Sequence, residues 1–129
     1  NSKVYINGED ITPSTGVITP TTFNAANNIT SPTNVTGFLF PEATVRSFKA
    51  LVTIVIDATA DLYSQMEIRG LQKATGVWVI TTNEIGDFSG IDFTIASDSS
   101  NGQIRYTSDN YSGFVSGVFI FSTLEVHNL

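Results

Sequence analysis

The amino-acid sequence predicts an all-β domain: an antiparallel β-sandwich of jelly-roll or Greek-key type that follows an extended N-terminal arm. Apolar and polar residues alternate with a period of two over much of residues 45–126, which is the pattern of strands with one buried face. Clusters rich in glycine, asparagine and serine interrupt this pattern about every ten residues, as in sandwiches and barrels. No window has the apolar spacing of an amphipathic helix.

Composition narrows the classes of partner. The chain has 129 residues, enough for one domain, and it contains no cysteine for disulfides or thiolate metal sites. Its net charge is −6 and its six basic residues are scattered, so nucleic-acid binding is not expected. The longest apolar runs are far shorter than a membrane span, so membrane insertion is not expected either. Because the chain begins with Asn1, we expect a processed protein or a piece of a longer one.

Residues 1–36 are predicted to form the extended arm or a linker, and residues 37–129 the sandwich domain. The first segment is dense in Thr, Asn, Pro and Gly. Pro13, Pro20 and Pro32 each lack a backbone donor, which discourages helices and central strands. The segment Val4–Gly8 could supply one short strand and a turn.

Two segments are apolar on both faces of the predicted strand. In "RSFKALVTIVIDA" (46–58), the even-numbered positions from Phe48 to Ile56 form one apolar face, and Leu51 and Val55 fall on the other. The segment 115–126 has the same character. A strand of this kind is covered on both sides, so we expect a homo-oligomer to supply the second cover.

The segments between these two alternate more simply. Met66 and Ile68 are expected to point inward, and Gly70 breaks the parity, which predicts a bulge or a bend. Residues 91–96 and 103–107 alternate on either side of Asn101-Gly102. Because Asn-Gly suits the positive φ angles of a type I′ turn, these two residues predict a hairpin. The preceding Asp98-Ser99-Ser100 lengthens the loop, so a longer hairpin is the alternative.

The stretch around residues 106–111 is the best candidate for a ligand site. Aromatic rings with neighbouring amides and carboxylates can hold a neutral glycan, and such groups occur here at Tyr106, Asp109, Asn110 and Tyr111. Trp78 lies within an apolar run and is expected in the core. The alternative is a hairpin and loop with no chemistry of its own.

Metal binding and catalysis have little support. Four aspartates occur in this region, but their spacing does not match a calcium loop: Asp87, Asp92, Asp98 and Asp109. The single histidine, His127, lies close to the C-terminus, which disfavours a catalytic triad. The four glutamates are each explicable as solvent-facing: Glu42, Glu67, Glu84 and Glu125. We therefore expect no catalytic residues, no metal and no cofactor.

Three motifs carry a resemblance to a known class of proteins: SPTNVTG (31–37), LYSQMEIRGLQK (62–73) and IRYTSDNYSGFVSG (104–117). With their surroundings, over residues 24–126, they resemble a β-structured domain of tailed-bacteriophage virion proteins, including tail-fibre-like ones. The resemblance implies a location in the virion and a homotrimer. It carries no catalytic or binding residue.

The expected function is that of a non-enzymatic virion domain, associated with a tail fibre, that attaches to a host-surface glycan or to another virion protein. Two alternatives stay open. One is a capsid or neck decoration protein with a purely structural role, in which the arm clamps a neighbouring subunit. The other is a carbohydrate-binding module of a secreted enzyme.

Overall fold

The computed structural model describes residues 4–6, 9–11 and 20–128, and within these it contains ten strands and no helix. The strands are β1 (Val4–Ile6), β2 (Glu9–Ile11), β3 (Thr21–Ala25), β4 (Thr33–Pro41), β5 (Val45–Asp57), β6 (Leu62–Ala74), β7 (Val77–Gly86), β8 (Ile91–Asp98), β9 (Asn101–Ser108) and β10 (Ser116–His127). The described residues include no helix that is long and apolar enough to cross a membrane.

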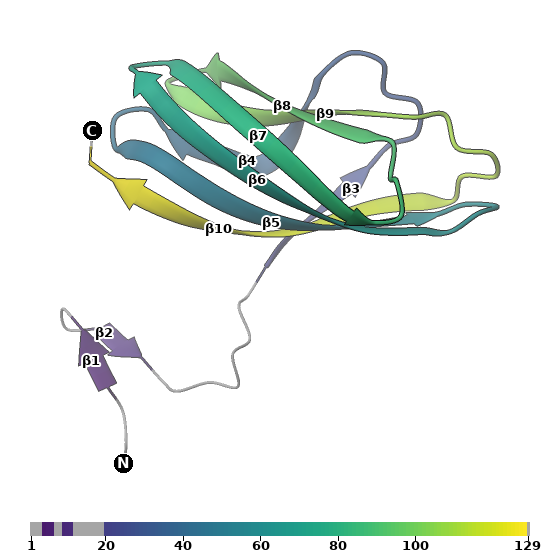
Figure 1. Ribbon diagram of the computed structural model, residues 1–129, viewed down its shortest axis with the longest axis horizontal. Helices are drawn as coiled ribbons and strands as arrows, with labels where there is room; N and C mark the ends of the chain where they lie inside the picture. Colours follow the sequence, from purple (N-terminus) through teal and green to yellow (C-terminus); the bar gives the residue numbers. More distant parts are fainter. Residues whose placement is uncertain (1–3, 7–8, 12–19, 129) are drawn as a thin grey trace.

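Two antiparallel sheets form a sandwich, so the predicted fold class is confirmed. One sheet has the strand order β3-β10-β5-β6-β7 and the other β4-β9-β8, and Figure 1 shows them as two layers. The chain changes sheet at β3–β4, β4–β5, β7–β8 and β9–β10. Loops from both sheets therefore meet at the ends of the sandwich.

The sandwich begins earlier in the chain than predicted. Residues 20–36 were assigned to the arm, but β3 pairs with β10 and β4 pairs with β9. Pro20 and Pro32 each stand directly before a strand, where a missing backbone donor breaks no ladder. The predicted boundary at residue 36 therefore moves to residue 20. Before it, β1 and β2 pair with each other, and the rest of the expected arm lies outside the described residues.

Aromatic side chains from both sheets build the core. Phe40 of β4 stacks on Phe48 of β5 with ring centroids 3.7 Å apart, and Phe38 of β4 stacks on Phe121 of β10 at 4.1 Å. Such pairs add about 0.5–1.5 kcal/mol each beyond the area that they bury. They join the two layers directly.

The two faces of β5 differ in their surroundings. The predicted inward face, at the even-numbered positions from Phe48 to Ile56, is buried, whereas Leu51 on the other face is 42% exposed. On β10, Phe119 and Phe121 are buried and Leu124 is 70% exposed. Within the described residues, the other sheet therefore covers one face of β5 and β10, and the second face that we predicted to be covered is exposed.

Gly70 does not form the predicted bulge. It pairs in register with Phe48, and the irregularity lies between Gln72 and Ala74. A Cβ at Gly70 would overlap the Phe48 ring. The glycine is needed for close approach of an aromatic ring, and the strand parity continues through it.

The predicted hairpin is present, but its turn lies two residues earlier than Asn101-Gly102. Asp98 pairs with Asn101, which leaves Ser99 and Ser100 as the turn residues. Their φ angles are 51° and 64°. Gly102 is instead a strand residue of β9, packed against Trp78.

Candidate functional site

The loop that carries Tyr111 connects β9 to β10 at one end of the sandwich. Three backbone hydrogen bonds hold it to two neighbouring segments. Asp109 N–H donates to Gly90 O at 3.2 Å in the β7–β8 connection; in the β5–β6 hairpin, Thr59 N–H donates to Ser112 O at 3.0 Å and Val115 N–H donates to Asp57 O at 2.7 Å. The backbone of the loop is therefore anchored along its length.

Tyr111 is half-buried and fully engaged in hydrogen bonds. Its hydroxyl donates to the Ser89 carbonyl oxygen, and its backbone N–H donates to Asn27 Oδ1 at 2.7 Å. Its ring stacks on Phe114 with centroids 6.0 Å apart. Burial, followed by the nearby Asp109 charge, raises the pKa of Tyr111 to about 12. The hydroxyl thus stays neutral and binds the loop to the β7–β8 connection.

Asp109 and Asn110 are exposed on the same loop. Asn110 Oδ1 accepts a hydrogen bond from Asn27 Nδ2 at 3.0 Å. A Cβ at Gly90 would overlap the Asp109 carboxylate, so the glycine permits this close approach. The Asp109 carboxylate and the Asn110 amide nitrogen are the loop groups best placed to meet a polar ligand.

Tyr106 is separated from these three residues. It is 2% exposed, and its hydroxyl accepts a hydrogen bond from Ala26 N–H at 3.0 Å. Its ring packs edge-on against Phe23 and Phe119. Tyr106 is therefore a core residue, and its ring is not presented to a ligand at the surface.

A small hollow lies beside Tyr111. It has a volume of about 190 Å³ and is lined by Ala58, Thr59, Ala60, Leu62, Tyr111 and Ser112. Ligand pockets commonly measure about 300–1,000 Å³. The hollow accommodates a small apolar group, and a larger ligand would have to lie over the exposed loop side chains.

Sequence reasoning missed a polar cluster next to this loop. The Glu84 carboxylate accepts hydrogen bonds from the Ser64 hydroxyl at 2.6 Å and from the Ser89 hydroxyl and N–H. Ser89 is fully buried and is the residue whose carbonyl binds Tyr111. The alternating pattern of β7 could have revealed this cluster, because Glu84 falls on the same face of the strand as Trp78 and Ile80. An inward-facing carboxylate needs hydrogen-bond donors.

The remaining ionisable candidates are dispersed. Asp87 accepts a hydrogen bond from Tyr63 N–H, Asp98 lies 3.4 Å from Arg105, and His127 lies 2.7 Å from Glu125. Within residues 4–6, 9–11 and 20–128, no three acidic, histidine or cysteine side chains gather as metal ligands would. Trp78 is partly buried against Phe40 and Phe48, as predicted.

Comparisons with known proteins give one informative likeness. No family model matches the chain, and no curated protein matches it in sequence. In structure, it is similar to the tailspike protein of Acinetobacter phage vB_ApiP_P1, with a TM-score of 0.63 and 16% sequence identity. The likeness covers 96% of this chain and 25% of the tailspike chain. The chain thus has a β-domain fold that recurs in part of a phage tailspike, which confirms in fold the resemblance to phage virion proteins.

Proposed function

We propose that this chain is a non-enzymatic structural domain of a bacteriophage virion, associated with the tail, that mediates attachment to a host-surface glycan or to another virion protein. The observation that carries the proposal is the shared fold with part of a phage tailspike, which extends over nearly the whole chain. The proposed domain assembles as a homo-oligomer, and we propose a trimer.

The local environments of the ionisable side chains support a structural role. Glu84 is occupied by two serine hydroxyls, and Glu42 accepts a hydrogen bond from the Trp78 indole at 3.0 Å. These carboxylates serve as acceptors inside the fold. General acid–base chemistry instead requires a carboxylate that can reach a substrate.

The exposed groups on the Tyr111 loop are the proposed glycan contact. Asp109 and Asn110 supply a carboxylate and an amide beside a partly exposed aromatic ring, which is a combination suited to sugar hydroxyls. Tyr111 itself anchors the loop, so removing it would disturb the site and the fold together. Asp109 and Asn110 are therefore the better residues to substitute in a binding test.

The test is binding of the Asp109→Ala/Asn110→Ala variant to host cells and to a glycan array. We expect loss of binding, with the control variant Asp92→Ala, exposed on β8, binding normally. Unchanged binding by the double variant removes the glycan site. The virion role is tested separately by detecting the chain in purified particles, and its absence from particles would contradict that role.

A further inference from the structure

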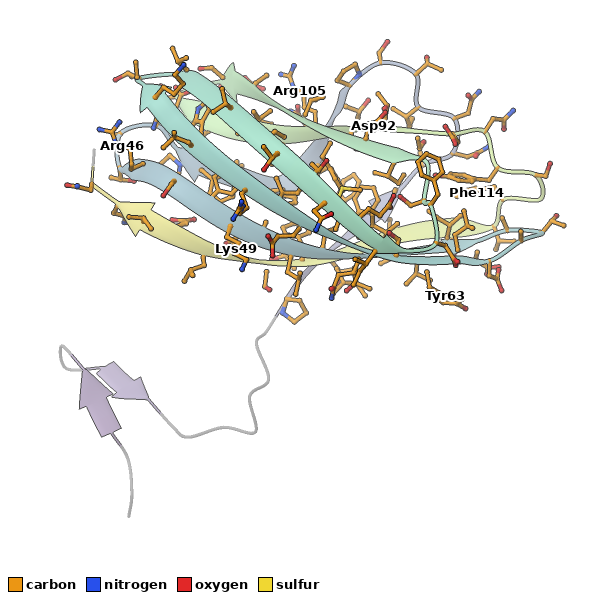
Figure 2. The ribbon with its side chains drawn as sticks, in the orientation of Figure 1. Arg46, Lys49, Tyr63, Asp92, Arg105 and Phe114 are labelled. Atoms are coloured by element: carbon orange, nitrogen blue, oxygen red, sulfur yellow. The ribbon has the colours of Figure 1, made fainter. Side chains whose placement is uncertain are left out.

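The side of the five-stranded sheet that points away from the three-stranded sheet is called the outer face below. It is formed by the odd-numbered residues 47–57 of β5, the odd-numbered residues of β6 and β7, and the even-numbered residues 118–126 of β10. Cross-strand register places them in rows, such as Val126, Ser47, Leu71 and Val79. Figure 2 shows Tyr63 at this face, directed away from the other sheet.

Exposed apolar side chains are concentrated on the outer face. Among the described residues, eleven large apolar side chains are exposed, and eight of them belong to this face. Tyr63 and Ile85 line one hollow near one end, and Leu71 and Val79 line another hollow further along the face. Several exposed apolar side chains gathered on one sheet face, with charged groups among them, are typical of a protein contact.

The centre of the outer face carries an unbalanced charge. Lys49 and Arg69 lie directly opposite each other on β5 and β6, although like charges opposite each other are unfavourable. Glu67 lies 3.3 Å from Lys49, and Arg69 has no ion-pair partner within the described residues. Two cations therefore face one anion here, on a chain whose net charge is −6. A neighbouring copy brings the same three charges, so its Glu67 can pair with Arg69 across the contact while it stays beside its own Lys49; one positive charge per copy remains.

The outer face is large enough for a stable contact. The strands β5, β6, β7 and β10 have 10–13 residues each. At about 4.8 Å between strands and about 3.3 Å per residue, four such strands cover roughly 700 Å². A standard interface buries about 800 Å² per partner, which is the same scale.

The chemistry of the central hollow favours protein over sugar. This hollow, of about 480 Å³, is lined by Lys49, Leu51, Glu67, Ser122, Thr123 and Leu124. It offers aliphatic and charged groups, and no aromatic ring on which a sugar could stack. Aliphatic side chains from a second sheet would fill it.

We propose that the outer face is the surface through which copies of this chain associate, with Arg69 of one copy paired with Glu67 of its neighbour. This inference rests on the proposed function, because it assigns the contact surface of the proposed homo-oligomer.

The test is sedimentation velocity of the full chain over a range of micromolar concentrations. The outer-face variant Leu51→Lys/Leu124→Lys is compared with the control Phe88→Lys/Val115→Lys. The two control residues are apolar, at least as exposed and off this face, and they receive the same charges. We expect association to weaken at least ~100-fold in the first variant, because like charges are then opposed across the contact. The control should assemble as the wild type does. Circular dichroism checks that both variants keep their strand content.

A pair of charge-reversal variants tests the same contact if the lysine variant fails to fold. Arg69→Glu alone should weaken association about tenfold, and mixing it with Glu67→Arg should restore mixed oligomers. If the outer-face variant forms the same oligomer as the wild type, this inference is overturned. The proposed function is then still tested separately, by incorporation of the chain into particles. A monomeric wild type overturns both this inference and the proposed oligomer. If the outer-face variant keeps the wild-type oligomeric state and loses only host-cell binding, the outer face is a host contact. That result also overturns this inference.

Discussion

Gly102 of β9 lies directly beneath the indole of Trp78 of β7, so that a Cβ at Gly102 would stand 2.8 Å from Trp78 Cζ2 and Nε1. The contact joins the two sheets, and the indole is held in place by its hydrogen bond to Glu42. A residue predicted from the sequence as a turn glycine is therefore a packing glycine.

Gly102→Ala should destabilise the domain by about 1–3 kcal/mol, because overpacking displaces the indole or the strand. Chemical denaturation measures the change in the free energy of unfolding. In the background of Trp78→Leu, which opens space above position 102, the same substitution should cost much less. Equal costs in both backgrounds would contradict the packing argument.

The turn between β8 and β9 should be improved by the double substitution Ser99→Asn/Ser100→Gly. Both positions have positive φ, which Asn and Gly adopt with less strain than serine. We expect about 0.5–1 kcal/mol of added stability, seen as a higher denaturation midpoint, because the relieved backbone strain exceeds the unfolded-state entropy that glycine adds. Ser112→Gly, at a loop position that is not among those with positive φ, is the control and should be neutral or destabilising.

Tyr111 should ionise late in an alkaline titration followed by tyrosine absorbance. Its folded-state pKa of about 12 lies above the ordinary 10.0, so the folded state favours the neutral hydroxyl. The resulting stabilisation is fully present below pH 10 and is lost as the pH rises through about 12. Tyr111→Phe should abolish the late step, and the control Tyr63→Phe should keep it. A late step that persists in Tyr111→Phe would refute the assignment.

Gln72→Leu should cost about 2–4 kcal/mol, because buried backbone groups would lose their partners. Gln72 is fully buried. Its amide nitrogen donates to the carbonyl oxygens of Glu42 and Val45, and its oxygen accepts from Gly76 N–H. The control Thr94→Leu, at an exposed position of β8 away from the outer face, should stay within about 0.5 kcal/mol of wild type. Thermal melts of both variants distinguish the two environments.

The long strands were predictable because one face of each is buried in this chain. The positions from Phe48 to Ile56 alternate without interruption, so the sequence pattern and the buried face coincide. The region before residue 37 was harder, because Thr and Asn there serve in the edge strands β3 and β4, and Pro20 and Pro32 stand just outside them. Gly70 and Gly102 were misinterpreted for another reason. A glycine that admits a ring from elsewhere in the fold has the same local signal as a turn or bulge.

The candidate site was predictable only in part. Asp109, Asn110 and Tyr111 share one loop, as their proximity in sequence suggested. Tyr106 does not join them, because it has the inward parity of Ile104 on β9. The bond from Tyr111 to Ser89 depends on how the β7–β8 connection approaches the loop, and no local pattern encodes that approach.

The position of β10 in the five-stranded sheet has a consequence for biosynthesis. Of the described strands it is translated last, yet it lies between β3 and β5 and supplies Phe119 and Phe121 to the core. Until residues 116–127 have left the ribosome, β3 has no neighbour in its sheet and β5 keeps an open edge. Unpaired edges of this kind invite aggregation, so nascent chains should depend on chaperones until the last strand inserts.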